Sequence, residues 1–100
     1  MAIDFFTANN FDYLRWDGST SVGTSGISAC GWVNVGGSAP ARFFSILTAS
    51  DKQLYVQTDG SGGVFAAFDS SSTSSVSYTQ NVWMHVAVVY DWTTLRLYVN

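Results

Sequence analysis

The chain has 100 residues, of which 47% are hydrophobic and 16% aromatic, and its formal net charge is −3. This length allows one small domain with one hydrophobic core, and the low charge with many aromatic residues excludes a disordered chain. Lys and Arg number only 4 in the whole chain, too few to form a basic surface, which excludes nucleic acid as a partner. The single cysteine, Cys30, excludes an internal disulfide and a metal site built on paired cysteines.

Short runs of β-forming residues alternate with clusters of Gly, Ser, Asn and Asp along the whole chain. Because no stretch shows the apolar spacing of a helix, the pattern predicts an all-β domain. The expected strands, in chain order, are 2–7, 13–16, 27–35, 42–48, 53–58, 64–68, 82–90 and 95–99. The polar stretch DSSSTSS at 69–75 is expected to be a solvated surface loop.

The alternation of side chains along each strand predicts which faces are buried. In 27–35 one side is apolar and the other mixed; the apolar side consists of Ile27, Ala29, Gly31, Val33 and Val35. In 82–90 both sides are apolar, so we expect a central strand covered on both faces, with His85 buried. In 95–99, Leu, Leu and Val alternate with Arg96 and Tyr98, a pattern typical of a sheet with one solvent-exposed face. Two facing antiparallel sheets satisfy all three patterns.

Three segments resemble laminin G-like domains: AIDFFTANNFDYLRW at 2–16, ISACGWVNVGG at 27–37 and NVWMHVAVVYDWTTLRLYVN at 81–100. The resemblance, to the laminin G-like and pentraxin-like part of the concanavalin A-like lectin/glucanase superfamily, implies an antiparallel two-sheet jelly-roll sandwich over residues 1–100. Relatives of this kind continue past the LYVN strand with further strands. The resemblance therefore also implies a domain truncated at its C-terminus, after the final hairpin, whose last strand needs another segment to pair with.

The carboxylates argue against catalysis. All 7 acidic residues are aspartates, and none lie two or four positions apart on one expected strand, whereas retaining glycoside hydrolysis requires a close carboxylate pair. His85 is the only histidine, so a nucleophile–histidine arrangement would have to use it. In the laminin G-like domains that this segment resembles, the position of His85 belongs to the fold signature. We therefore expect no catalytic residue and no enzymatic activity.

Calcium is the one cofactor that the resemblance leaves open, because many related domains bind it at the sheet rim through Asp, Asn and carbonyl oxygens. The sequence contains no close cluster of oxygen ligands, and loop aspartates commonly only shape turns. The candidate ligands, all in expected loops, are Asp51, Asp59, Asp69 and Asp91.

Aromatic side chains are the candidates for ligand contact. Trp92 lies in the turn YDWTT, where small polar residues are favoured, so it lacks an evident role in the fold. The expected ligand-binding residues are Trp92, the adjacent Asp91, and Tyr55. Alternatively, Trp92 folds back over Arg96 or the neighbouring sheet edge. Core or edge packing on a sheet face is the favoured role of Tyr55, Phe65, Phe68 and Tyr78, and structural roles are expected for Trp16 and Trp32.

These patterns favour a non-enzymatic recognition module that binds carbohydrate or a protein surface within a larger adhesive or surface assembly. Two alternatives stay open: a structural jelly-roll unit of a phage virion or tail fibre, and an accessory carbohydrate-binding domain of a glycoside hydrolase. The opening MAIDFF has no secretory leader, and no apolar run is long enough to span a membrane. We expect no membrane insertion, while self-association, or completion by a missing C-terminal segment, stays open.

Overall fold

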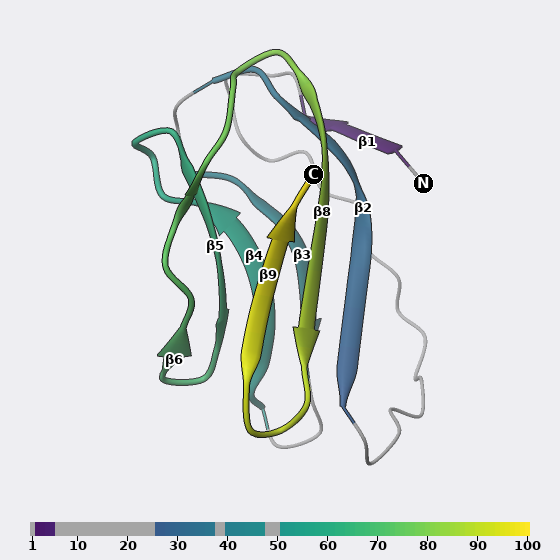
Figure 1. Cartoon of the computed structure of the whole chain (residues 1–100), viewed down its shortest axis with the longest axis vertical. Helices are drawn as coiled ribbons and strands as arrows, with labels where there is room; N and C mark the ends of the chain where they lie inside the picture. The colour runs from purple at the N-terminus through teal and green to yellow at the C-terminus, as the bar shows by residue number, and fades with distance from the viewer. Residues whose placement is uncertain (1, 6–25, 38–39, 48–50) are drawn as a thin grey trace.

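The computed structural model describes residues 26–37, 40–47 and 51–100, and the backbone of 2–5. Figure 1 shows that the described chain forms a sandwich of two β-sheets without a helix. The strands, in chain order, are β1 Ala2–Phe5, β2 Ile27–Val35, β3 Arg42–Leu47, β4 Gln53–Thr58, β5 Gly63–Phe68, β6 Ser71–Ser72, β7 Val76–Ser77, β8 Trp83–Tyr90 and β9 Leu95–Val99. The all-β prediction is confirmed, and β2, β4 and β9 have the expected bounds. The expected strand at 13–16 lies outside the described residues.

The first sheet, sheet A, has the strand order β1-β2-β8-β9. β1 runs parallel to β2, and the other two pairs are antiparallel. The expected central position of 82–90 is confirmed, because β8 lies between β2 and β9. The register places Trp32 opposite His85, and Val88 opposite both Ala29 and Leu97. Because directly opposite residues point to the same side, each sheet face is a continuous surface across three strands.

The second sheet, sheet B, has the order β3-β4-β5-β6, and β7 also pairs with β5. The expectation that 69–75 is only a loop is wrong, since β6 pairs Ser71 with Phe68 and Ser72 with Ala67. The physical reason is that backbone groups can extend a sheet edge whatever the side chains are. Thr73 strengthens this edge, because its N–H donates to the Ala66 carbonyl at 2.9 Å and its hydroxyl accepts from the Ala66 N–H at 3.1 Å.

The core lies between the two sheets and is built from the inward residues of five strands. Val56, Val64 and Val86 are fully buried, and both sheets contribute such residues. The expected burial of the apolar side of β2 is confirmed at Ile27 and Val33. In β9, Leu95, Leu97 and Val99 are half-buried while Arg96 and Tyr98 are exposed, as predicted for a sheet with one solvent-exposed face.

The expectation that β8 is covered on both faces is wrong. Met84, Val86 and Val88 are buried, but on the other face Trp83 is 43% exposed and His85 is only half-buried. Sheet B covers the inner face of sheet A and leaves these outward side chains at the surface. In the part of the chain that the structure describes, no helix is long and apolar enough to cross a membrane.

Candidate functional site

An aromatic cluster closes one end of the sandwich, and we call it the rim cluster: Phe68, Tyr90 and Trp92. The ring centroids of Phe68 and Tyr90 are 4.4 Å apart, which ties sheet B to sheet A. Trp92 meets both rings edge-on, at 6.1 Å from Phe68 and 5.4 Å from Tyr90. Phe68 is buried in the core, whereas Trp92 remains 41% exposed. The indole therefore contacts the core with one side and offers the other to solvent.

Trp92 adopts a backbone conformation that glycine normally occupies. Its φ is +71°, at the first central position of the hairpin turn between β8 and β9, and the Asp91 N–H donates to the Thr94 carbonyl at 3.2 Å. Turns of the type that suits β-hairpins require a positive φ there, which costs a residue with a side chain about 1–2 kcal/mol. The neighbouring contacts hold Trp92 in this conformation, so its ring is fixed in place.

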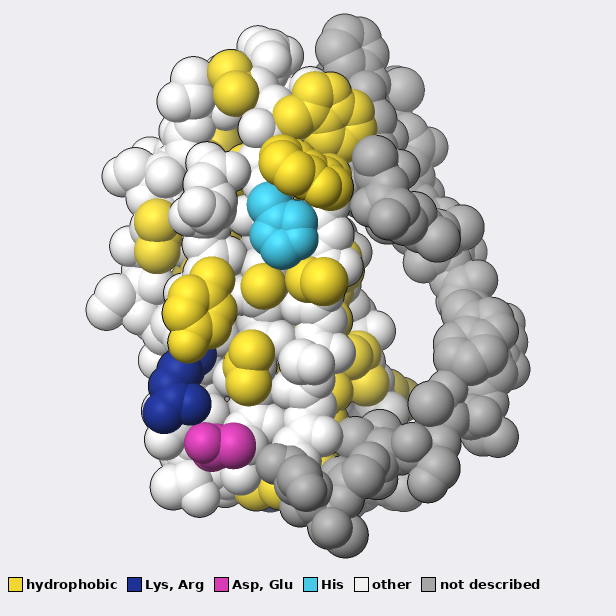
Figure 2. Space-filling view, turned by 45° about the vertical axis from the view of Figure 1, so that its right-hand side comes forward, with side chains coloured by type: hydrophobic (Ala, Val, Ile, Leu, Met, Phe, Trp, Pro, Cys, Tyr) yellow, Lys and Arg dark blue, Asp and Glu magenta, His cyan; other side chains and the backbone are white. Residues whose placement is uncertain are grey.

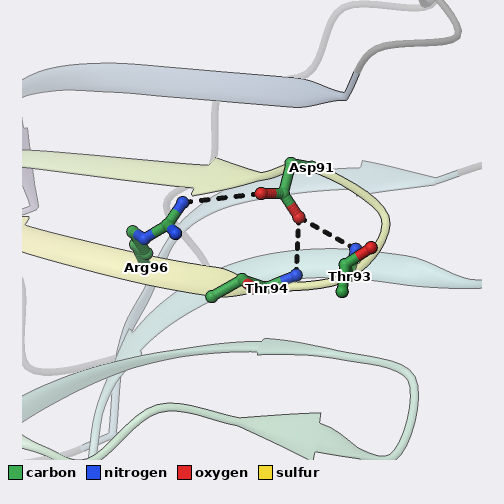
Figure 3. Close-up of polar contacts among 4 residues, drawn as sticks. All are labelled: Asp91, Thr93, Thr94 and Arg96. Carbon is green, nitrogen blue, oxygen red and sulfur yellow. Dashed lines mark hydrogen bonds and ion pairs between the residues drawn. The ribbon is translucent and has the colours of Figure 1, made fainter.

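Asp91 holds the turn that carries Trp92 (Figure 3). Its Oδ1 accepts hydrogen bonds from the Thr93 N–H at 2.9 Å and the Thr94 N–H at 2.6 Å, and its Oδ2 lies 3.5 Å from Arg96 Nη1. The backbone N–H groups of Thr94 and Thr93 lower the pKa of Asp91 below its ordinary value. Asp91 is thus engaged in shaping the turn; that it also contacts ligand stays a prediction.

A shallow hollow of about 230 Å³ lies beside the turn, between the ends of β2 and β8. Ser28, Val89, Tyr90 and Asp91 are among its lining residues. A ligand group placed there would lie on the same end of the sandwich as the rim cluster, because Tyr90 belongs to both.

Tyr55 lies apart from this end, on the outer face of sheet B. The Arg42 guanidinium carbon is 3.9 Å from the Tyr55 ring centroid, and the Phe65 ring meets it edge-on at 6.3 Å. Gln57 Oε1 accepts hydrogen bonds from Arg42 Nε at 3.2 Å and from Arg42 Nη2 at 3.0 Å, which fixes the guanidinium over the ring. One face of Tyr55 is therefore already covered, and the structure does not bring it together with Trp92.

The packing roles expected for the other aromatic residues agree with their positions. Phe68 is buried, and Tyr78 packs against the core. The Tyr78 hydroxyl donates to the Gly37 carbonyl at 3.3 Å. Burial, with a smaller contribution from the charge of Asp59, raises the pKa of Tyr78 above its ordinary value.

The candidate calcium ligands are dispersed. Asp59 Oδ1 accepts from the Ser61 and Gly63 N–H groups, and Asp69 pairs with Lys52 at 3.2 Å. Among the described residues, no three His, Cys, Asp or Glu side chains form a group that could hold a metal ion. Calcium binding stays a prediction without a described cluster to support it.

Among the described residues, an exposed aromatic surface on sheet A was missed from the sequence. We call it the aromatic face: Trp32, Trp83, His85 and Tyr98 on the outer side of sheet A. Figure 2 shows hydrophobic side chains gathered above and below the single histidine on this face. The rings of Trp32 and His85 meet at 5.4 Å and 69°. The mixed side of β2 and the outward position of Tyr98 in the sequence pattern could have indicated this surface. It was missed because Trp32 was expected to be structural and His85 to be buried.

A laminin G family model, Laminin_G_3, described as the concanavalin A-like lectin/glucanases superfamily, matches residues 8–100. In the same comparisons, no curated protein and no solved structure matches the chain. The match covers most of the sequence, and the two-sheet sandwich without helices agrees with it. The chain therefore belongs to the laminin G-type domains of the concanavalin A-like lectin/glucanase superfamily.

Proposed function

We propose that this domain is a non-enzymatic carbohydrate-recognition module that binds sugar at its rim through Trp92. The observation that carries the proposal is the Trp92 ring, which is 41% exposed although its turn position favours glycine. Tryptophan can stack on the C–H faces of sugar rings, and a ring that is already fixed loses little entropy on binding. Exposed Thr93 and Thr94 lie beside it, with hydroxyl groups suited to hydrogen-bonding a sugar.

Two features support recognition over hydrolysis. The chain contains no glutamate, and Asp59, Asp69 and Asp91 are separately engaged in turns and ion pairs, not paired as a hydrolase requires. Members of this family commonly bind carbohydrate or protein. We place this recognition within a larger adhesive or surface assembly.

The proposal is tested with a glycan array, probed with the labelled domain and two variants. Trp92→Gly removes the indole and keeps a residue suited to the positive φ. Asn81→Gly is the matched control, because Asn81 also has a positive φ, of 60°, in a turn that precedes β8. We expect the glycan signal to disappear in Trp92→Gly and to persist in Asn81→Gly. Equal signals from all three proteins, or no glycan bound by the unaltered domain, would contradict the proposal.

A further inference from the structure

Arg42 on β3 has no carboxylate partner within the described part of the chain. The other described Lys and Arg side chains are paired: Lys52 Nζ lies 3.2 Å from Asp69 Oδ2, and Arg96 Nη1 lies 3.5 Å from Asp91 Oδ2. The Arg42 guanidinium instead meets neutral side chains of β4. Its charge is therefore left uncompensated, although the chain as a whole has a formal net charge of −3.

Contacts within the domain hold the Arg42 guanidinium in one position. Its Nη1 donates to Gln53 Oε1 at 2.8 Å, and Gln57 Oε1 accepts from its Nε at 3.2 Å and its Nη2 at 3.0 Å. The Tyr55 ring supports the guanidinium carbon at 3.9 Å. Gln53 is itself oriented, because its Nε2 donates to Ser45 Oγ. A ligand that binds this guanidinium therefore does not have to order a long, flexible side chain first.

The Arg42 guanidinium keeps donors for a further partner. A guanidinium has five N–H donors, and the amide oxygens of Gln53 and Gln57 engage three of them. One N–H group on Nη1 and one on Nη2 are left. Because the engaged oxygens are neutral, the full positive charge also remains. A carboxylate, with two oxygens and a negative charge, is the group that matches this donor set.

Apolar side chains flank this cation on the outer face of sheet B. Leu47 lies directly opposite Gln53 in the register of β3 against β4, and it is 66% exposed. Phe65 lies directly opposite Gln57 in the register of β4 against β5, and its ring meets Tyr55 edge-on at 6.3 Å. A fitting ligand therefore carries a carboxylate with apolar groups beside it.

The arrangement favours an acidic protein segment over an acidic polysaccharide. A polysaccharide with a charge on every repeat needs a row of cations, whereas the described part of this face offers one uncompensated cation, Arg42. A peptide can place one Asp or Glu between apolar residues. Arg and Tyr are also enriched among the residues that dominate protein interfaces, where they lie among less important contacts.

We propose that the outer face of sheet B docks an acidic segment of a protein partner, whose carboxylate binds the two remaining N–H groups of Arg42 while its apolar neighbours contact Leu47 and Phe65. Tyr55 is a positioning residue in this site, since it supports the guanidinium. The site is separate from the rim cluster and does not depend on the proposed function. Because one exposed ion pair contributes little, an isolated segment should bind with a Kd of about 1–10 mM.

An NMR titration of the isotope-labelled domain tests the proposal. The probe is the blocked peptide acetyl-Gly-Leu-Glu-Leu-Gly-amide, and the same peptide with Gln in place of Glu is the uncharged comparison. We expect the Glu peptide to shift the Arg42 Nε–H signal and the side-chain amide signals of Gln53 and Gln57, and the Gln peptide to leave them in place. Added salt should weaken the Glu peptide's binding.

Three variants locate the site, and circular dichroism confirms that each keeps the fold. Arg42→Gln should weaken binding of the Glu peptide about fivefold, measured on the backbone amide signals of β4. Arg42→Lys keeps the charge but loses the planar donor set, so its affinity should be intermediate. The matched control is Arg96→Gln, which removes an exposed arginine that Asp91 already pairs, and it should bind like the unaltered domain.

Four results would overturn this site. Equal affinity of Arg42→Gln and the unaltered domain, or equal shifts with the Gln peptide, would show that Arg42 binds no carboxylate. Equal affinity for sodium glucuronate would assign the site to acidic sugars. Shifts of the same signals on concentrating the domain alone would make a second copy the occupant. No shift with the Glu peptide would refute the site outright, while the glycan array still decides separately on the rim.

Discussion

Cys30 of β2 and Ala87 of β8 lie directly opposite each other in the antiparallel register of sheet A, and Cys30 is exposed. Directly opposite Cα atoms are about 4.5–5.5 Å apart, a separation that a disulfide can bridge. We therefore expect Ala87→Cys to form an intrachain disulfide with Cys30 under mild oxidation. Loss of both free thiols, with a faster-migrating monomer on a non-reducing gel, would report the bond.

The matched control is Val89→Cys, because Val89 faces the same side but lies opposite Ser28. It should keep both thiols under the same conditions. If Val89→Cys closed as readily as Ala87→Cys, the register of β2 against β8 described here would be incorrect.

The left-handed conformation of Trp92 predicts an unusual order of stability. Trp92→Gly and Trp92→Ala lose the same ring contacts with Phe68 and Tyr90. Because only glycine adopts a positive φ without strain, Trp92→Gly should be more stable than Trp92→Ala by about 1 kcal/mol in free energy of unfolding. Urea denaturation measures the difference. A more stable alanine variant would show that the turn does not hold the conformation seen here.

Asp91 should make the stability of the domain depend on pH in the acid range. Its folded pKa lies below the ordinary value of 3.8 because the Thr94 and Thr93 N–H groups bond its charged form. A depressed folded pKa adds stability that is fully present above the unfolded pKa, and that is lost as the pH falls through the folded pKa. Melting temperatures of the unaltered domain should thus fall as the pH drops below about 4.

The comparison for this prediction is Asp91→Asn, which keeps a side-chain oxygen for the turn but has no proton to gain at low pH. Its melting temperature should change less over the same acid range. Parallel pH profiles for the two proteins would assign the acid sensitivity to other groups, such as Asp59, whose folded pKa is also lowered by backbone hydrogen bonds from Ser61 and Gly63.

Strand positions and inward faces could be predicted from the sequence because alternation is a direct consequence of the extended backbone. Ile27, Val33, Met84 and Val86 all occupy buried inward positions, as their period-two pattern requires. The turn position of Trp92 was also predictable, because the polar residues around it are typical of a hairpin.

Contacts between distant elements could not be predicted in this way. Nothing in the order of residues shows that Phe68 of one sheet reaches Tyr90 of the other, so the partly packed state of Trp92 emerged only in three dimensions. The outer apolar side of β8 suggested a second covering layer, and His85 was wrongly expected to be buried for the same reason. Alternation shows which residues share a face, but not whether another element packs on it.

The register between β2 and β8 has an evolutionary consequence. Core residues such as Val86 and surface rings such as Trp83 alternate on one strand, so point substitutions can exchange the outward rings while the packing beneath stays intact. A single-residue insertion within β8 would instead turn the rings toward sheet B and the valines toward solvent. The outer surface of sheet A can therefore change by substitution, whereas an insertion or deletion within β8 would disrupt the core.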